Sequence, residues 1–268
     1  GVSYTLAERN NFYLSFAVAQ KEPTRSDFTD RYKFAADDTY PSSEKLYDWE
    51  LGYQYTAPRL SLGVNLCYMK YKDQLVPTGM VNDDSNALNT NVPDSYRRGV
   101  ELSASWRATG WFTVGANATF SQNRIENYVD ALKDSPTYGK ELGDMTIAYS
   151  PDVIANAFLN FHHRGFEAVF HTQHVGKQYF TNNENDALSL DAYCVTNLNL
   201  AYTFRTRSAR SVRLGLLINN LFNAEYESNG YGYSYMDTWS GPAPVRIDEA
   251  YYFPQAPLNV LANVTVKF

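Results

Sequence analysis

The sequence lacks several features, and each absence removes a class of protein. No apolar run approaches the ~18 residues that a membrane-spanning helix needs, which excludes helical membrane proteins. Only two cysteines are present, Cys67 and Cys194, and no CxxC or Cys/His cluster surrounds them. We therefore expect two unpaired cysteines, and neither a disulfide framework nor a zinc site. The 23 Lys and Arg against 29 Asp and Glu give a net charge of -6, which argues against nucleic acid as a partner.

Aromatic residues, in contrast, are abundant. The chain of 268 residues contains 22 Tyr, 15 Phe and 4 Trp, although its mean hydropathy is only -0.44. A transmembrane β-barrel is compatible with such a polar average, because its strands alternate lipid-facing and lumen-facing residues.

The dominant hydrophobic period is two, which is the period of a β-strand. Alternation is clear in residues 12–18, 49–55, 100–106 and 260–268, and the whole chain gives about eleven such segments. Short connections near residues 8, 57, 109, 165 and 208 alternate with long polar ones near 32, 83, 138, 186 and 239. The pattern predicts an all-β fold, an antiparallel up-and-down transmembrane β-barrel whose short turns share one end. A secreted soluble β protein is the competing interpretation.

Two short connections allow more detailed predictions. A two-residue turn at Arg164 and Gly165 would pair His163 with Phe166 and place apolar residues opposite one another on one face. In the connection 108–110, we expect Gly110 to adopt a positive φ. Aromatic residues gather where strands meet turns, as expected for girdles at a bilayer boundary; these are Tyr53, Tyr55, Trp106, Trp111, Phe161, Phe166, Tyr202 and Phe204.

No pattern in the sequence indicates catalysis. His162 and His163 are adjacent in a strand and therefore point to opposite faces, and the same holds for His171 and His174. There is no GxSxG motif and no spacing of paired carboxylates. We expect no catalytic, cofactor-binding or metal-binding residues, and a protein that is not an enzyme.

The last long connection is rich in aromatic residues set among Gly230, Gly232 and Gly241. Tyrosine and tryptophan offer rigid contact area with a polar group, which suits sugars or planar chelates. The ligand-binding candidates are Tyr226, Tyr231, Tyr233, Tyr235 and Trp239. The alternative is that these rings only pack the connection onto its neighbours.

Several segments resemble TonB-dependent outer-membrane receptors. They are NNLFNAEYESNGYGYSY (residues 219–235), the terminal NVTVKF that ends at Phe268, RRGVELSASW (97–106) and QKEPTRSDF (20–28). The resemblance implies that residues 1–268 form the C-terminal half of a barrel of about 22 strands. A plug domain, a segment that contacts the TonB complex and the other strands would then precede them. It also implies that Phe268 is a signal for the barrel-assembly machinery.

The resemblance implies a function as well. We expect a receptor in the bacterial outer membrane that imports a scarce solute with TonB-derived energy. An iron–siderophore complex is the first expectation for the solute, with cobalamin or a glycan behind it. The alternative is a passive outer-membrane pore, or a surface-binding barrel, without energy coupling.

Overall fold

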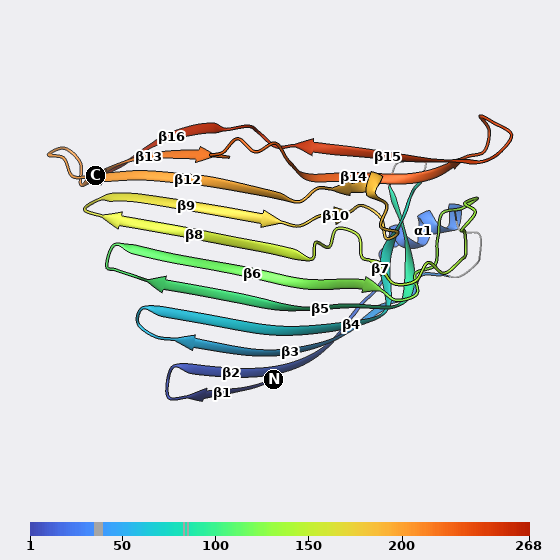
Figure 1. Ribbon diagram of the computed structural model, residues 1–268, viewed down its shortest axis with the longest axis horizontal. Coiled ribbons are helices and arrows are strands. Elements are labelled where there is room, and N and C mark those ends of the chain that lie inside the picture. The colour runs from blue at the N-terminus through green and yellow to red at the C-terminus, as the bar shows by residue number, and fades with distance from the viewer. Residues whose placement is uncertain (35–39, 83, 85) are drawn as a thin grey trace.

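The structure, a computed structural model, describes residues 1–34, 40–82, 84 and 86–268. Its main feature is a curved antiparallel sheet whose strands follow one another in chain order, as Figure 1 shows. The strands along this path are β1 (Val2–Leu6), β2 (Asn10–Lys21), β3 (Glu44–Thr56), β4 (Leu60–Val81), β5 (Ala87–Arg107), β6 (Phe112–Ile125), β8 (Val153–His163), β9 (Phe166–Val175), β12 (Tyr193–Phe204), β13 (Ser211–Asn219) and β16 (Asn259–Lys267). The short β7 (Met145–Thr146) pairs with β6 beside this path.

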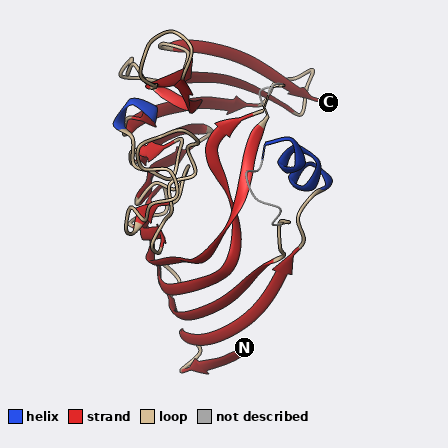
Figure 2. Ribbon diagram, turned by 90° about the vertical axis from the view of Figure 1, so that its right-hand side faces the viewer, coloured by secondary structure: helices blue, strands red, loops and turns tan. Residues whose placement is uncertain are grey.

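The sheet forms an open arc rather than a closed barrel. β1 and β16 are its two edges and do not pair with each other. All short turns lie at one end of the strands and all long connections at the other (Figure 1). Viewed from the end with the long connections, the strands curve around a concave side (Figure 2). The predicted up-and-down antiparallel order is confirmed.

The period of two in the sequence becomes two different faces of the sheet. Leu14, Leu51, Leu66 and Val100 lie opposite one another across β2 to β5, so their side chains share one face. That face, here called the outward face, leaves large apolar side chains uncovered: Leu14 is 57% and Leu51 51% exposed. An apolar surface of this extent is stable only against another apolar phase, because water would penalise it.

The turn between β8 and β9 has the predicted register. His163 pairs with Phe166, and both turn residues have positive φ, 48° at Arg164 and 87° at Gly165. Gly165 is required because a Cβ there would lie 2.3 Å from the carbonyl oxygen of Thr203. The expectation for Gly110 is wrong, since its φ is not positive. The ladder between β5 and β6 ends at Arg107 and Thr113, and the wider turn 108–111 needs no left-handed residue.

The long connections contain more regular structure than their polar sequences predict. Most of the connection expected around residue 83 is instead strand, because β4 and β5 extend beyond the sheet as one hairpin. Similarly, the last connection pairs with itself. The remaining elements are α1 (Arg25–Phe34), β10 (Gln178–Tyr179), η1 (Asp186–Leu188), β11 (Ser189–Leu190), β14 (Glu227–Asp237) and β15 (Val245–Pro254).

The end with the long connections also contains the two buried hydrophobic clusters that the described residues form. One joins Val76, Val92, Ile125, Tyr128 and Ile147. The other joins Phe180, Leu188 and Leu190 and lies under β14 and β15. The sheet thus has its self-packed cores at one end, and its middle has an uncovered apolar face. Among the described residues, no helix is long and apolar enough to cross a membrane.

Candidate functional site

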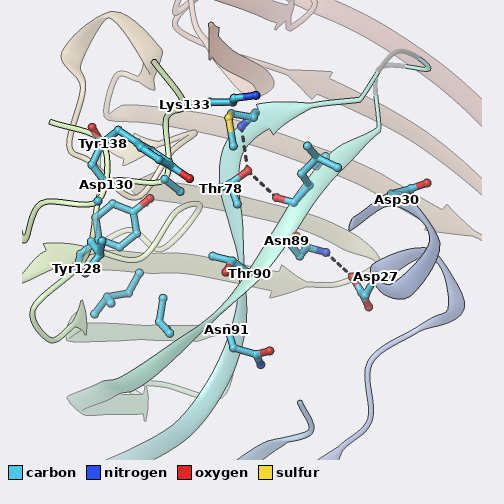
Figure 3. Close-up of a pocket in the computed structure, with 18 of the residues that line it drawn as sticks. Asp27, Asp30, Thr78, Asn89, Thr90, Asn91, Tyr128, Asp130, Lys133 and Tyr138 are labelled. Atoms are coloured by element: carbon cyan, nitrogen blue, oxygen red, sulfur yellow. Dashed lines mark hydrogen bonds between the residues drawn. The ribbon is translucent and has the colours of Figure 1, made fainter. Parts of the chain in front are cut away.

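A cavity of about 610 Å³ lies at the end of the sheet that bears the long connections. Three segments distant in sequence form its walls: α1, the extended β4–β5 hairpin and residues 125–139 (Figure 3). Its polar and charged lining includes Asp27, Asp30, Thr78, Asn89, Thr90, Asn91, Tyr128, Asp130, Lys133 and Tyr138.

The α1 wall begins at a capping motif. Thr24 donates from both its backbone N–H and its hydroxyl to Oδ2 of Asp27, each at 2.7 Å, and the N–H of Asp27 donates to the carbonyl of Thr24 at 3.1 Å. The second carboxylate oxygen of Asp27 accepts a hydrogen bond of 2.9 Å from Nδ2 of Asn89 on β5. Asp27 therefore caps the helix and fixes it to the hairpin at the same time.

The hairpin wall turns away from the direction of the other strands. Beyond Asp73, which has a φ of 53°, β4 and β5 cross the concave side of the sheet towards β14 (Figures 1 and 2). Asn182 holds this position: its Nδ2 donates to the carbonyl of Pro77 at 2.6 Å, and its Oδ1 accepts from the N–H of Ala148 at 2.7 Å. Asn182 is fully buried, so one side chain connects the hairpin to two other connections.

The third wall is a loop closed by one carboxylate. The buried Asp130 accepts hydrogen bonds from the N–H of Leu132 at 3.0 Å and from the hydroxyls of Ser135 and Thr137 at 3.2 and 2.5 Å. Backbone bonds between Tyr128 and residues 142–143 close the base of the loop. The loop thus satisfies many of its own polar groups, while Tyr128 at its base packs against Val76 and Val92 of the hairpin.

Two titratable groups of the cavity have perturbed pKa values. Burial, followed by the charge of Asp130, raises the pKa of Tyr128 to about 12. For Asp27, burial favours a higher pKa, but the hydrogen bonds from Asn89 and Thr24 outweigh it and lower the pKa. At neutral pH the cavity therefore presents a protonated phenol and an ionised carboxylate.

The predicted ligand-binding tyrosines lie apart from this cavity, on β14. Tyr231 stacks on Tyr251 with ring centroids 4.9 Å apart. Glu249 accepts hydrogen bonds from the hydroxyls of Tyr233 at 2.6 Å, Tyr251 at 2.8 Å and Tyr235 at 3.3 Å. The bonds from Tyr233 and Tyr251 lower the pKa of Glu249, and the bond to Glu249 raises the pKa of Tyr233. Two of the five candidates, Tyr233 and Tyr235, are thus brought together around one carboxylate, and Tyr231 joins them by stacking on Tyr251.

The alternate residues of β14 explain why the tyrosines share one face. A Cβ at Gly230 would lie 2.7 Å from the ring of Phe180, and one at Gly232 would lie 2.9 Å from Leu188. Glycine lets the opposite face of β14 pack against this cluster. The other two candidates are separate: Tyr226 stacks on Tyr193 at 4.7 Å, and Trp239 is 78% exposed beyond the end of β14.

Sequence reasoning did not find the cavity, although two signals were available. Thr24 and Asp27 have the spacing of a capping box, which indicates a helix start inside a segment expected to be irregular. The second signal is the alternation of Leu88, Thr90 and Val92 with Asn89 and Asn91, which is typical of a strand. Which segments meet around the cavity depends on tertiary packing and has no local signal.

Comparison with known proteins agrees with this architecture. The profile of the family described as "TonB dependent receptor-like, beta-barrel" matches residues 1–221. The chain belongs to the TonB-dependent receptors. It is therefore a β-barrel protein of the bacterial outer membrane, and the outward face is the face that contacts lipid.

Solved structures of TonB-dependent receptors share the fold. The chain is similar to the ferric yersiniabactin uptake receptor FyuA from Yersinia pestis, with 19% identity, a TM-score of 0.68 and coverage of 99% of this chain and 36% of that one. The copper transporter OprC gives 18% identity, a TM-score of 0.70 and coverage of 98% and 38%. The ferric citrate transporter FecA gives 15% identity, a TM-score of 0.66 and coverage of 98% of this chain and 36% of that one. The chain thus spans about a third of the length of these structures.

Family membership also orients the receptor. Short turns of such barrels lie on the periplasmic side and long connections outside, so the cavity and the β14–β15 hairpin are at the external end. The aromatic side chains predicted to form a girdle gather at the periplasmic turns, where Phe161 stacks on Trp111 at 5.9 Å. Proteins of this family are receptors and transporters, not enzymes. Among the described residues, no group of three or more His, Cys, Asp or Glu side chains could hold a metal ion.

Proposed function

We propose that the protein containing this chain imports a scarce solute across the outer membrane, and that the external cavity contacts this solute before import. The supporting observation is the cavity itself, about 610 Å³ in volume at the external end of an outer-membrane wall. Its walls combine carboxylates, amides, phenols and one ammonium, which can recognise a ligand with a polar periphery. We propose no covalent step; the residues bind and release.

The chain contributes part of the barrel in this proposal. Residues 1–268 form its C-terminal half, and a plug domain and further strands are supplied by residues before Gly1. Two observations support this: both edge strands, β1 and β16, have one unpaired side, and the chain spans about a third of its structural relatives. An unpaired edge is costly in lipid because backbone groups there lack partners. The plug region would contact the TonB complex, and Phe268, directly after β16, would be read by the barrel-assembly machinery.

A metal chelate is the solute class that we propose. Three similar structures are a ferric yersiniabactin uptake receptor, a ferric citrate transporter and a copper transporter. The tyrosines of β14 and β15 support the same class, because stacked phenols such as Tyr231 and Tyr251 suit planar chelating groups. Cobalamin and glycans are the alternative solute classes.

Binding to the full-length protein tests the proposal. Ferric chelates, cyanocobalamin and oligosaccharides are titrated by calorimetry against the wild type, Lys133→Ala and the matched control Arg205→Ala. Both cations are exposed, but Lys133 lines the cavity and Arg205 lies in a periplasmic turn. We expect Lys133→Ala to weaken one ferric chelate several-fold, because the ammonium is the one cation among the described lining residues. Equal affinity of Lys133→Ala and the control would contradict the role of the cavity.

The tyrosines of β14 need their own variant. Replacing Tyr231 and Tyr235 by serine retains Gly230 and Gly232, and so leaves the packing on Phe180 intact. A loss of affinity for the same chelate would extend the binding surface to β14. Unchanged affinity would assign these rings to packing alone.

Uptake by whole cells distinguishes active import from the passive pore. Accumulation of the chelate is measured with and without a protonophore. We expect accumulation to stop when the energy source is removed. Continued entry down the concentration gradient would favour the pore.

A further inference from the structure

A second cavity, of about 570 Å³, lies on the outward face, away from the external end. Residues from β4, β5, β6, β8 and β9 line it, mostly through outward-pointing aliphatic side chains and small residues. This surface contacts lipid, so it has no role in the proposed recognition of an imported solute.

The register of the paired strands explains why this surface is hollowed. One row of paired residues runs through Ala104, Ala116 and Ala157, and the next runs through Ala118 and Ala155. Five alanines therefore form the floor. The rows on either side contain larger side chains, which are Leu66, Val100, Phe120 and Val153 on the external side and Leu60, Trp106, Val114, Leu159 and Phe170 on the periplasmic side. The result is a groove, here called the alanine groove, between two ridges.

The groove runs across the strands of the sheet. It crosses five strands, and the usual strand spacing gives it a length of about 19 Å. At one end it starts at Leu62, the third residue of β4 after a periplasmic turn; at the other it ends at His174, next to the external end of β9. One leaflet of the ~30 Å hydrocarbon core is about 15 Å deep. The groove is therefore long enough to hold a single extended acyl chain.

Polar side chains occupy the external end of the groove. The hydroxyls of Thr172 and Thr196 bond each other at 2.9 Å. His174 faces outward beside Ala155 and Cys194, and within the described part of the chain it has no hydrogen-bond partner. An unpartnered imidazole on a lipid-facing wall is unfavourable unless a polar group of the lipid meets it.

We propose that the alanine groove holds one acyl chain of an outer-membrane phospholipid, with the polar linkage of that lipid at His174. The groove is continuous with the surface that already contacts lipid, its floor is apolar, and its polar end is at the external level of the wall. A bound lipid restores the contacts that five short side chains leave unfilled.

Native mass spectrometry of the full-length protein tests this proposal. The protein is delipidated in detergent and titrated with dimyristoylphosphatidylethanolamine. Leucines at positions 116 and 157, introduced as Ala116→Leu and Ala157→Leu, fill the groove from outside without entering a packed core. Ala262→Leu is the matched control, because Ala262 also faces outward but lies on β16, outside the groove. Heat-modifiable electrophoresis shows that each variant is folded.

We expect the wild type and Ala262→Leu to retain one lipid, and the groove-filled variant to bind it roughly tenfold more weakly, as overpacking of a fitted site does. His174→Ala should weaken retention less and reduce the preference for the phospholipid over an alkane of similar length. Equal retention by all variants would overturn the proposal. A change from dimer to monomer on filling the groove, without a change in lipid retention, would also overturn it and assign the face to a second copy of the protein.

Discussion

The membrane-spanning part of the sheet, here called the wall, and the external end of the chain satisfy apolar side chains in opposite ways. In the wall, Leu214 is 45% exposed and Val264 64%, and their partner is the bilayer. At the external end, Ile125 and Leu188 are fully buried in clusters that the chain forms by itself. The difference shows that one sequence can rely on lipid in one region and on its own packing in another. Each region should therefore fail for a different kind of substitution.

Introducing a charge into the wall should have the largest effect. Leu200→Arg places a guanidinium on the lipid-facing side, which costs about 2–4 kcal/mol at the bilayer midplane. We expect strongly reduced assembly, measured as heat-modifiable barrel in outer-membrane fractions. Asn199→Arg is the matched control, since Asn199 points to the concave side in the same strand and should assemble much better. Equal assembly of the two variants would invalidate the assignment of faces.

Removing apolar volume should destabilise the external end more than the wall. Ile125→Ala leaves a cavity in a buried cluster, with an expected cost of about 2–5 kcal/mol at the external end. Leu214→Ala only exchanges contacts with lipid, so we expect a clearly smaller loss. Hydrogen exchange of residues 125–147 would measure the first effect, and urea unfolding in vesicles would compare both. A larger loss for Leu214→Ala would reverse the comparison.

A polar substitution should separate the hairpin from the wall. Asn182→Ala removes the bonds to Pro77 and Ala148 and leaves both groups without these partners, at a cost of about 1–3 kcal/mol. We expect faster hydrogen exchange in residues 74–92 with unchanged protection in β8 and β9. Asn183→Ala, one position along, is the control. Unchanged exchange in the hairpin would show that other contacts hold it.

The smallest effect at neutral pH belongs to Tyr128. Its pKa in the folded protein is about 12, against 10.0 for the free side chain. Because the pKa is raised, the contribution of the buried neutral phenol to folding stability is complete below pH 10 and is lost as pH rises through about 12. We expect the difference in phenolate absorbance between the wild type and Tyr128→Phe to appear only above about pH 11. Ionisation of that residue near pH 10 would contradict its burial.

The sequence predicts the wall much better than the external end. Alternation such as Phe12 to Val18 depends on one physical fact, that successive side chains point to opposite faces, and the turn at Arg164 and Gly165 then fixes the register. Gly110 shows the limit of that reasoning, because a wider turn there uses no left-handed residue.

At the external end, polarity concealed regular structure. Asn86 to Asn91 is polar enough to be expected as loop, yet most of it forms the start of β5, because β4 provides a partner. Position also depends on contacts that no local pattern records. Asn182 and Pro77 are 105 residues apart, and their bond places one wall of the cavity. The tyrosines of β14 were found from composition, but Glu249 on β15, which accepts hydrogen bonds from two of them, was not.

The ladder between β4 and β5 has a kinetic consequence. It runs without a change of register from Leu60 and Trp106 at the periplasmic turn to Pro77 and Asn89 beside the cavity. Asn89, Thr90 and Asn91 are therefore held by the same hydrogen-bonded ribbon that crosses the bilayer. In the proposed import, a solute arriving from outside would meet these three residues already in place, so the encounter need not wait for them to become ordered.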